Sequence, residues 1–299
     1  MYLEKDLSHY HEPVGDLLND LNSISSEEYC LTDEQIQHFN EQGYISNIKL
    51  LENEQIDQLR EELKEIMDPG HPAHALLYEF HTNESQDPDR VLFHCLGHWR
   101  MTQGFHDVLW NPALVMAASQ IFGGKSVRFW HDQLFLKPAK HGGVVAWHQD
   151  YSYWMRTKPM QHLTAWVGLD DATTDNGCLH YIPGSHKWGL LNKPTLTGEM
   201  MGLTDFLTDE QTKALDKAIP IELKKGYATI HHPLLIHGSF ENNSDKPRRA
   251  FVLNVFADGT CSDSDEALLE GVPVIHKGEK MEGQFFPLIY KSSVSEGNL

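Results

Sequence analysis

A histidine and an aspartate stand two residues apart near the middle of the chain, and another histidine follows much later. They are His148, Asp150 and His237. If His148 and Asp150 share a strand, their side chains point to the same face, because successive strand residues alternate sides. Two histidines and one carboxylate on one side of a metal leave its other positions open, as in non-haem Fe(II) oxygenases. The pattern predicts a catalytic site, since a structural metal site is closed by protein ligands.

This spacing alone has little specificity. The chain contains 19 histidines and 43 acidic residues among its 299, so about two or three His-x-acid pairs arise by chance. Asp150 could be a turn residue and His148 a packed polar side chain. His231 and His232 compete with His237 as the third ligand.

Composition and charge bound the class of protein that carries these residues. Hydrophobic residues make up 40% and charged residues 22%, which is ordinary for a globular chain, and no run approaches the about 18 apolar residues of a membrane span. The net charge of −19 disfavours nucleic acid and anionic membrane as partners. Four widely separated cysteines argue against a zinc site or a disulfide framework. The first residues do not resemble a signal peptide, so we expect a cytoplasmic protein.

Helical signals dominate the first part of the chain. A capping box at Thr32 predicts a helix that ends at Gly43, followed by a short strand to Ile48. Over residues 52–67, apolar residues recur at intervals of three and four, which predicts an amphipathic helix. Two further helices are predicted over 103–110 and 112–121. We expect residues 1–125 to form a helical buttress.

After Lys125 the chain becomes rich in aromatic and β-branched residues. Short strands are predicted over 127–136, 144–150, 163–169, 178–182, 221–223, 227–231, 234–237 and 250–256. Many short strands separated by turn residues favour a sandwich or barrel, and a jelly roll is one such fold. We therefore expect one domain, mainly β with flanking helices, in which residues 126–257 form the core and 258–299 an extension. A polar insert at 187–219, with a helix over 209–218, and a histidine-rich segment at 71–98 are the expected lids.

Several separated motifs occur in a characteristic order. They are His148-Gln149-Asp150, the segment 175–186 (DNGCLHYIPGSH), and His237-Gly238-Ser239 followed by Arg248. In these motifs, across roughly residues 32–257, the chain resembles the phytanoyl-CoA dioxygenase family of Fe(II)/2-oxoglutarate oxygenases. The resemblance implies a double-stranded β-helix, a jelly-roll (cupin-like) variant, with the metal at one open end.

By this resemblance, His148, Asp150 and His237 match the iron ligands of the family. An aspartate at this position implies oxygenation, because related halogenases carry a small residue there and bind chloride instead. His237 is favoured over its two rivals because it occupies the position of the family before Gly-Ser.

The resemblance also implies a site for the cosubstrate. Arg248 matches the arginine that binds the distal carboxylate of 2-oxoglutarate, and a planar guanidinium suits that task through two parallel hydrogen bonds. Ser239 is placed to help hold the same carboxylate. Gln133 and Trp166 align with positions that line the cosubstrate pocket. Arg249 is the alternative to Arg248, since only one of two neighbouring strand residues faces inward.

The implied activity is hydroxylation of an unactivated C–H bond in a small molecule, using Fe(II), 2-oxoglutarate and O2 and releasing succinate and CO2. Desaturation and ring formation are the alternative outcomes of the same chemistry. The acidic charge and the carboxyl-terminal residues Glu296–Leu299, which form no peroxisomal signal, argue against phytanoyl-CoA and favour a lipid-like compound or secondary metabolite. The alternatives are a jelly roll that keeps the three ligands without turnover, and a metal-free sugar- or peptide-binding jelly roll. The sequence indicates no oligomeric state.

Overall fold

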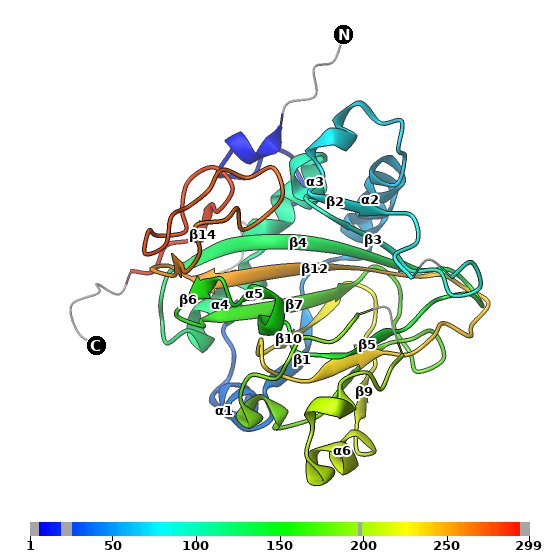
Figure 1. Cartoon of the computed structure of the whole chain (residues 1–299). Coiled ribbons are helices and arrows are strands. Elements are labelled where there is room, and N and C mark those ends of the chain that lie inside the picture. Colours follow the sequence, from blue (N-terminus) through cyan, green and yellow to red (C-terminus); the bar gives the residue numbers. More distant parts are fainter. Residues whose placement is uncertain (1–5, 19–25, 86, 197–198, 294–299) are drawn as a thin grey trace.

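Two antiparallel sheets form the centre of the molecule (Figure 1). The computed structural model describes residues 6–18, 26–85, 87–196 and 199–293. The larger sheet has the order β1-β10-β7-β12-β4-β3-β2, with β14 also paired to β4, and the smaller sheet has the order β5-β11-β8-β9. Neither sheet is closed, and the fold is the jelly roll expected from the sequence, mainly β with flanking helices.

The strands of the larger sheet are β1 (Tyr44–Lys49), β2 (Glu79–His81), β3 (Phe93–Leu96), β4 (Val127–Lys137), β7 (His162–Gly168), β10 (Tyr227–His231), β12 (Arg248–Ala257) and β14 (Leu288–Tyr290). Those of the smaller sheet are β5 (Val145–His148), β8 (Leu179–Tyr181), β9 (Ile219–Ile221) and β11 (His237–Ser239). A separate pair joins β6 (Thr157–Lys158) to β13 (Cys261–Ser262).

Six α-helices are described: α1 (Asp33–Gln42), α2 (Asn53–Ile66), α3 (Gln103–Asp107), α4 (Pro112–Ile121), α5 (Tyr151–Trp154) and α6 (Asp209–Leu215). Short 3-10 turns are η1 (Leu7–His9), η3 (Ser26–Tyr29), η4 (Pro72–Leu76), η5 (His98–Arg100), η6 (Val108–Trp110), η7 (Ser185–Trp188) and η8 (Thr204–Phe206). Within the described residues, no helix combines the length and apolar character that a membrane crossing needs.

Helix α1 shows why the local signals around it are reliable. The Thr32 hydroxyl accepts from the Gln35 backbone, and the Gln35 side chain accepts from the Thr32 backbone, which is the predicted capping box. Gly43 ends the helix at φ +87°, a conformation that favours glycine, and a Cβ there would lie 2.5 Å from a His186 ring nitrogen.

The strand β12 separates two interiors of the molecule. Its residues Phe251, Leu253 and Val255 face the main apolar core, where they pack with α2, α3 and α4. The alternate residues Arg248 and Val252 face the space between the two sheets. The helices therefore stabilise one face of the larger sheet and leave the other free to build a site.

The segment 71–98 contributes to the sheet instead of forming a long loop. Its strands β2 and β3 pair with each other, and β3 pairs with β4. The sequence shows no period there because each strand is only three or four residues long.

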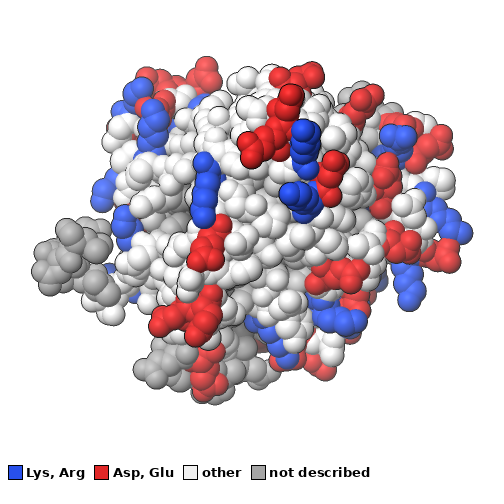
Figure 2. Space-filling view, turned by 90° about the horizontal axis from the view of Figure 1, so that it is seen from below, with Lys and Arg blue, Asp and Glu red and all other residues white. Residues whose placement is uncertain are grey.

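Acidic and basic side chains are interspersed over the face of the molecule shown in Figure 2.

Candidate metal centre

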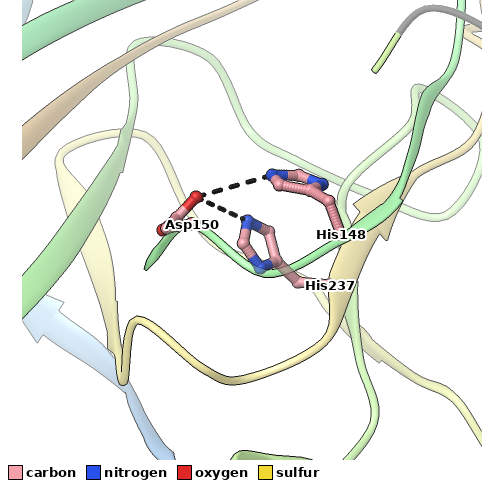
Figure 3. A group of neighbouring side chains, drawn as sticks. All are labelled: His148, Asp150 and His237. Carbon is pink, nitrogen blue, oxygen red and sulfur yellow. Dashed lines mark ion pairs between the residues drawn. The ribbon is translucent and has the colours of Figure 1, made fainter. Parts of the chain in front are cut away.

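The side chains of His148, Asp150 and His237 converge between the two sheets (Figure 3). His148 is the last residue of β5 and His237 the first of β11, and the two lie opposite each other in the antiparallel register. Nε2 of each histidine is 3.5 Å from Oδ1 of Asp150. One ligand atom from each residue lies within 4.8 Å of the other two, and all three residues are buried. A single cation can therefore contact all three.

Asp150 does not lie on the strand that carries His148, which corrects the expectation of one strand over 144–150. Strand β5 ends at His148, and Asp150 has the helical angles φ −59° and ψ −44° at the start of α5. Tertiary contacts end the strand, because the Gln149 amide donates to the carbonyls of Gly189 and Leu234. The aspartate thus reaches the histidines from a turn.

Both histidines present the same nitrogen to the centre. Nδ1 of His148 is 2.8 Å from the Ala146 carbonyl, and Nδ1 of His237 is 2.9 Å from the Leu235 carbonyl. A carbonyl oxygen only accepts, so these contacts assign the proton to Nδ1 and leave the Nε2 lone pair free. Burial and the nearby His148 hold the pKa of His237 well below its ordinary value. Neutral imidazoles with a fixed tautomer are the form that binds a metal.

The second carboxylate oxygen of Asp150, Oδ2, points away from the two histidine ligands and has two hydrogen-bond partners. Thr164 Oγ1 donates to Oδ2 at 2.5 Å, and His231 Nε2 lies 3.0 Å from the same atom. His231 Nδ1 is in turn 2.9 Å from the hydroxyl of Tyr181. Burial alone would raise the pKa of Asp150, but the neighbouring histidines, His237 first and then His148 and His231, hold it well below its ordinary value. Oδ1 therefore remains as an ionised ligand atom.

A cavity of about 410 Å³ opens beside these residues. Strands of both sheets line it, and so do residues of the segment 71–98 and of the insert 187–219. The four residues expected at the cosubstrate site all border this cavity, namely Gln133, Trp166, Ser239 and Arg248. Its volume lies in the range typical of small-molecule sites.

Arg248 is 1% exposed, and its guanidinium lacks the partners that a buried cation normally has. Among the described residues, nothing hydrogen-bonds its Nε or Nη1. Its Cζ lies 5.3 Å from the ring centre of Trp166. Burial lowers the pKa of Arg248 to about 10, so the group stays charged at neutral pH. A buried, charged guanidinium with two unpartnered nitrogens fits an anionic ligand.

Arg249 has the opposite environment. Its Nε and Nη2 contact the Asp170 carboxylate at 2.8 and 2.7 Å, and its backbone nitrogen donates to the same group at 2.9 Å. Of the two neighbouring arginines, Arg248 borders the cavity and Arg249 does not, in line with the expectation that only one of them faces inward.

Sequence reasoning missed two residues that hold Asp150 and one buried lysine next to Arg248. His231 was considered only as a rival ligand or a strand-end residue, although it holds Asp150. Thr164 could have been found from alternation, since it stands two residues before Trp166 on β7. Lys137 is buried opposite Arg248 on β4, and its role depends on contacts with a strand of the other sheet.

Comparison with known proteins gives a consistent picture. The phytanoyl-CoA dioxygenase (PhyH) family model matches residues 39–250. A phytanoyl-CoA dioxygenase from Arabidopsis thaliana is 26% identical over 263 residues, which cover 77% of this chain and 90% of the relative. The Danio rerio phytanoyl-CoA dioxygenase domain-containing protein 1 is also 26% identical, with 75% and 90% covered. The crystal structure of the non-heme alpha ketoglutarate dependent carbocyclase SnoK superposes with a TM-score of 0.68 at 18% identity, covering 88% of this chain and 98% of SnoK, and this likeness shows the fold.

Proposed function

Because the chain belongs to the phytanoyl-CoA dioxygenase family, we propose that it hydroxylates an unactivated C–H bond of a small molecule as an Fe(II)- and 2-oxoglutarate-dependent dioxygenase. The observation that carries the proposal is the arrangement of His148, Asp150 and His237. Their free ligand atoms face one point at the edge of a cavity, and the orientation of each is fixed by a hydrogen bond on its far side.

The ligand set suits a ferrous ion that needs open positions. The two imidazoles and the carboxylate would hold such an ion from one side, and the cavity lies beside these three residues. Once bound, iron and 2-oxoglutarate supply the oxidising chemistry, in which one oxygen atom of O2 enters the substrate C–H bond and the other enters succinate as CO2 is lost. We assign His148, Asp150 and His237 as the metal ligands.

The remaining residues of the site orient the metal ligands or bind the cosubstrate. His231 and Thr164 keep the Asp150 carboxylate turned toward the histidines. Arg248 and Ser239 are the proposed partners of the distal carboxylate of 2-oxoglutarate, with Trp166 against the guanidinium. This assignment gives the unpartnered nitrogens of Arg248 an acceptor.

The walls of the cavity support a substrate with an apolar body. Beyond the metal centre the lining includes Trp130, Phe135, Tyr153, Trp154, Leu196, Leu268 and Leu269. Aromatic and aliphatic side chains bind through burial of apolar surface, while a few polar groups fix orientation. We therefore propose a lipid-like compound or a secondary metabolite as substrate.

The decisive test is conversion of 2-oxoglutarate to succinate by the protein supplied with Fe(II) and O2. We expect slow succinate release without substrate and faster release when a screened compound is hydroxylated, with the product identified by mass spectrometry. His148→Ala should abolish turnover and weaken iron binding. His180→Ala is the matched control, because His180 lies on β8, packs on Phe240 and does not line the cavity. Iron binding without succinate formation, whatever compound is supplied, would instead favour the non-catalytic jelly roll.

A further inference from the structure

Lys137 is a buried lysine with no part in the metal centre. It ends β4, is 0% exposed, and lies directly opposite Arg248 in the register of β4 and β12. Its Nζ donates to Ser239 Oγ at 2.7 Å, to the Ser239 carbonyl at 3.2 Å and to the Phe240 carbonyl at 2.5 Å. Three acceptors match the three hydrogens of an ammonium group.

All three acceptors are uncharged oxygens, so they satisfy the hydrogens of Lys137 without neutralising its charge. Burial, and next the charge of Arg248, lower the pKa of Lys137 well below its ordinary value. Two basic side chains thus lie side by side in the interior on neighbouring strands, where burial disfavours a charge on both. Such an arrangement is unfavourable unless an anion joins it.

The contact with Lys137 also fixes what the Ser239 hydroxyl can do. A hydroxyl has one hydrogen to donate and two lone pairs that accept. Because Ser239 Oγ accepts from Lys137, its own hydrogen is available to another acceptor. Ser239 borders the same cavity as Arg248.

We propose that Lys137 is a positioning residue for the 2-oxoglutarate site: it holds Ser239 so that the hydroxyl donates to the distal carboxylate bound by Arg248. The inference rests on the proposed function and extends it to a residue that does not itself contact the ligand.

Binding of 2-oxoglutarate to the Fe(II)-loaded protein without oxygen tests this directly, since no turnover occurs. Calorimetry gives the 2-oxoglutarate affinity, and a separate titration gives the Fe(II) affinity. We expect Lys137→Met to weaken 2-oxoglutarate binding by about tenfold or more, because Ser239 loses the donor that orients its hydroxyl toward the carboxylate. Its Fe(II) affinity should be unchanged, whereas a merely structural defect would lower both.

A double-mutant cycle then separates positioning from independent charge. If Lys137 acts through Ser239, then Lys137→Met and Ser239→Ala together should weaken binding no more than the worse single variant. Lys137→Gln retains an amide donor and should recover part of the affinity, and it replaces Lys137→Met in the cycle if that variant does not fold. Lys125→Met is the matched control, because Lys125 precedes the same strand and also donates to an uncharged oxygen, of Gln161, at 3.0 Å.

Two results would overturn the inference. One is unchanged 2-oxoglutarate affinity in the folded Lys137 variant, and the other is that the two single effects multiply in the double variant. Failure of the wild-type protein to bind 2-oxoglutarate is a different outcome, because it would contradict the proposed function itself.

Discussion

Arg248 and Arg249 are neighbours in sequence but lie on opposite sides of β12. The two sides differ in whether the guanidinium finds a partner within the chain. Arg249 belongs to an ion cluster in which the Asp170 carboxylate contacts both Arg249 and, at 2.6 Å, Arg60 of α2. Arg248 faces the cavity, with Lys137 opposite and two nitrogens that no described residue hydrogen-bonds. The Arg249 guanidinium is paired with a carboxylate of the chain, whereas the Arg248 guanidinium has no such partner among the described residues.

The difference teaches how the fold divides stability from ligand binding. A buried polar group without a partner costs free energy, and a satisfied one contributes modestly. The ion pairs of Asp170 with Arg60 of α2 and Arg249 of β12 therefore stabilise the fold. Arg248, in contrast, keeps two nitrogens that can bind an anion. Substitutions on the two sides should have separable effects, on unfolding in one case and on binding in the other.

The largest effect is expected for Arg248→Met. Loss of two charge-assisted hydrogen bonds should weaken 2-oxoglutarate binding by about 3 kcal/mol, or more than 100-fold. The free energy of unfolding should not fall, because Arg248 gives up no hydrogen bond from these nitrogens within the described chain. Calorimetry and urea denaturation measure the two quantities. Arg249→Met is the control, and a loss of binding as large as that of Arg248→Met would erase the distinction.

The next largest effect is expected for Asp170→Asn. The change leaves Arg249 and Arg60 without their shared carboxylate, so the free energy of unfolding should fall by about 2 kcal/mol, less than for a fully buried pair because these side chains are partly exposed. Urea denaturation measures this change. The affinity for 2-oxoglutarate should stay at the wild-type value, and a matching loss of affinity would show that the two regions are coupled.

The split between the two arginines was predictable because it depends only on strand alternation. The same is true of α1, whose capping box and terminal glycine lie within a dozen residues. Local signals of this kind also gave the boundaries of β10 and, within a residue or two, of α2 and β4. Where neighbouring residues decide the conformation, the sequence alone predicts the boundaries of an element.

Other features depend on contacts between distant segments and could not be read locally. Strand β11 begins at His237, where the expected strand over 234–237 ends, because its partners β5 and β8 set its limits. Asp150 leaves its strand because Gln149 binds carbonyls forty and eighty-five residues away. The contact of Lys137 with Ser239 spans 102 residues. The ligand motifs of the site could therefore be predicted from the sequence, but the residues that position those ligands could not.

A smaller effect is expected from pH. Burial alone would raise the pKa of Asp170, but the hydrogen bonds and charge of Arg249 outweigh it and lower that pKa. A lowered folded-state pKa stabilises the protein above the unfolded value of about 3.9, and this contribution is lost as pH falls through the folded value. The advantage of wild type over Asp170→Asn should thus shrink by about 1 kcal/mol as pH drops below 4. Denaturation curves at several pH values measure it, and a constant difference would contradict the pairing.

The smallest effect is expected for Arg60→Met, and it shows how much of the cluster depends on its second arginine. Asp170 keeps its two side-chain contacts and its backbone contact with Arg249, so no buried charge is left alone. The free energy of unfolding should fall by only about 0.5 to 1 kcal/mol, because the pair is partly exposed and Asp170 keeps its other partner. Lys64→Met on the same helix is the control, since its pair with Glu61 is exposed and should contribute almost nothing. A loss as large as that of Asp170→Asn would mean that Arg60, and not Arg249, is the main partner of the carboxylate.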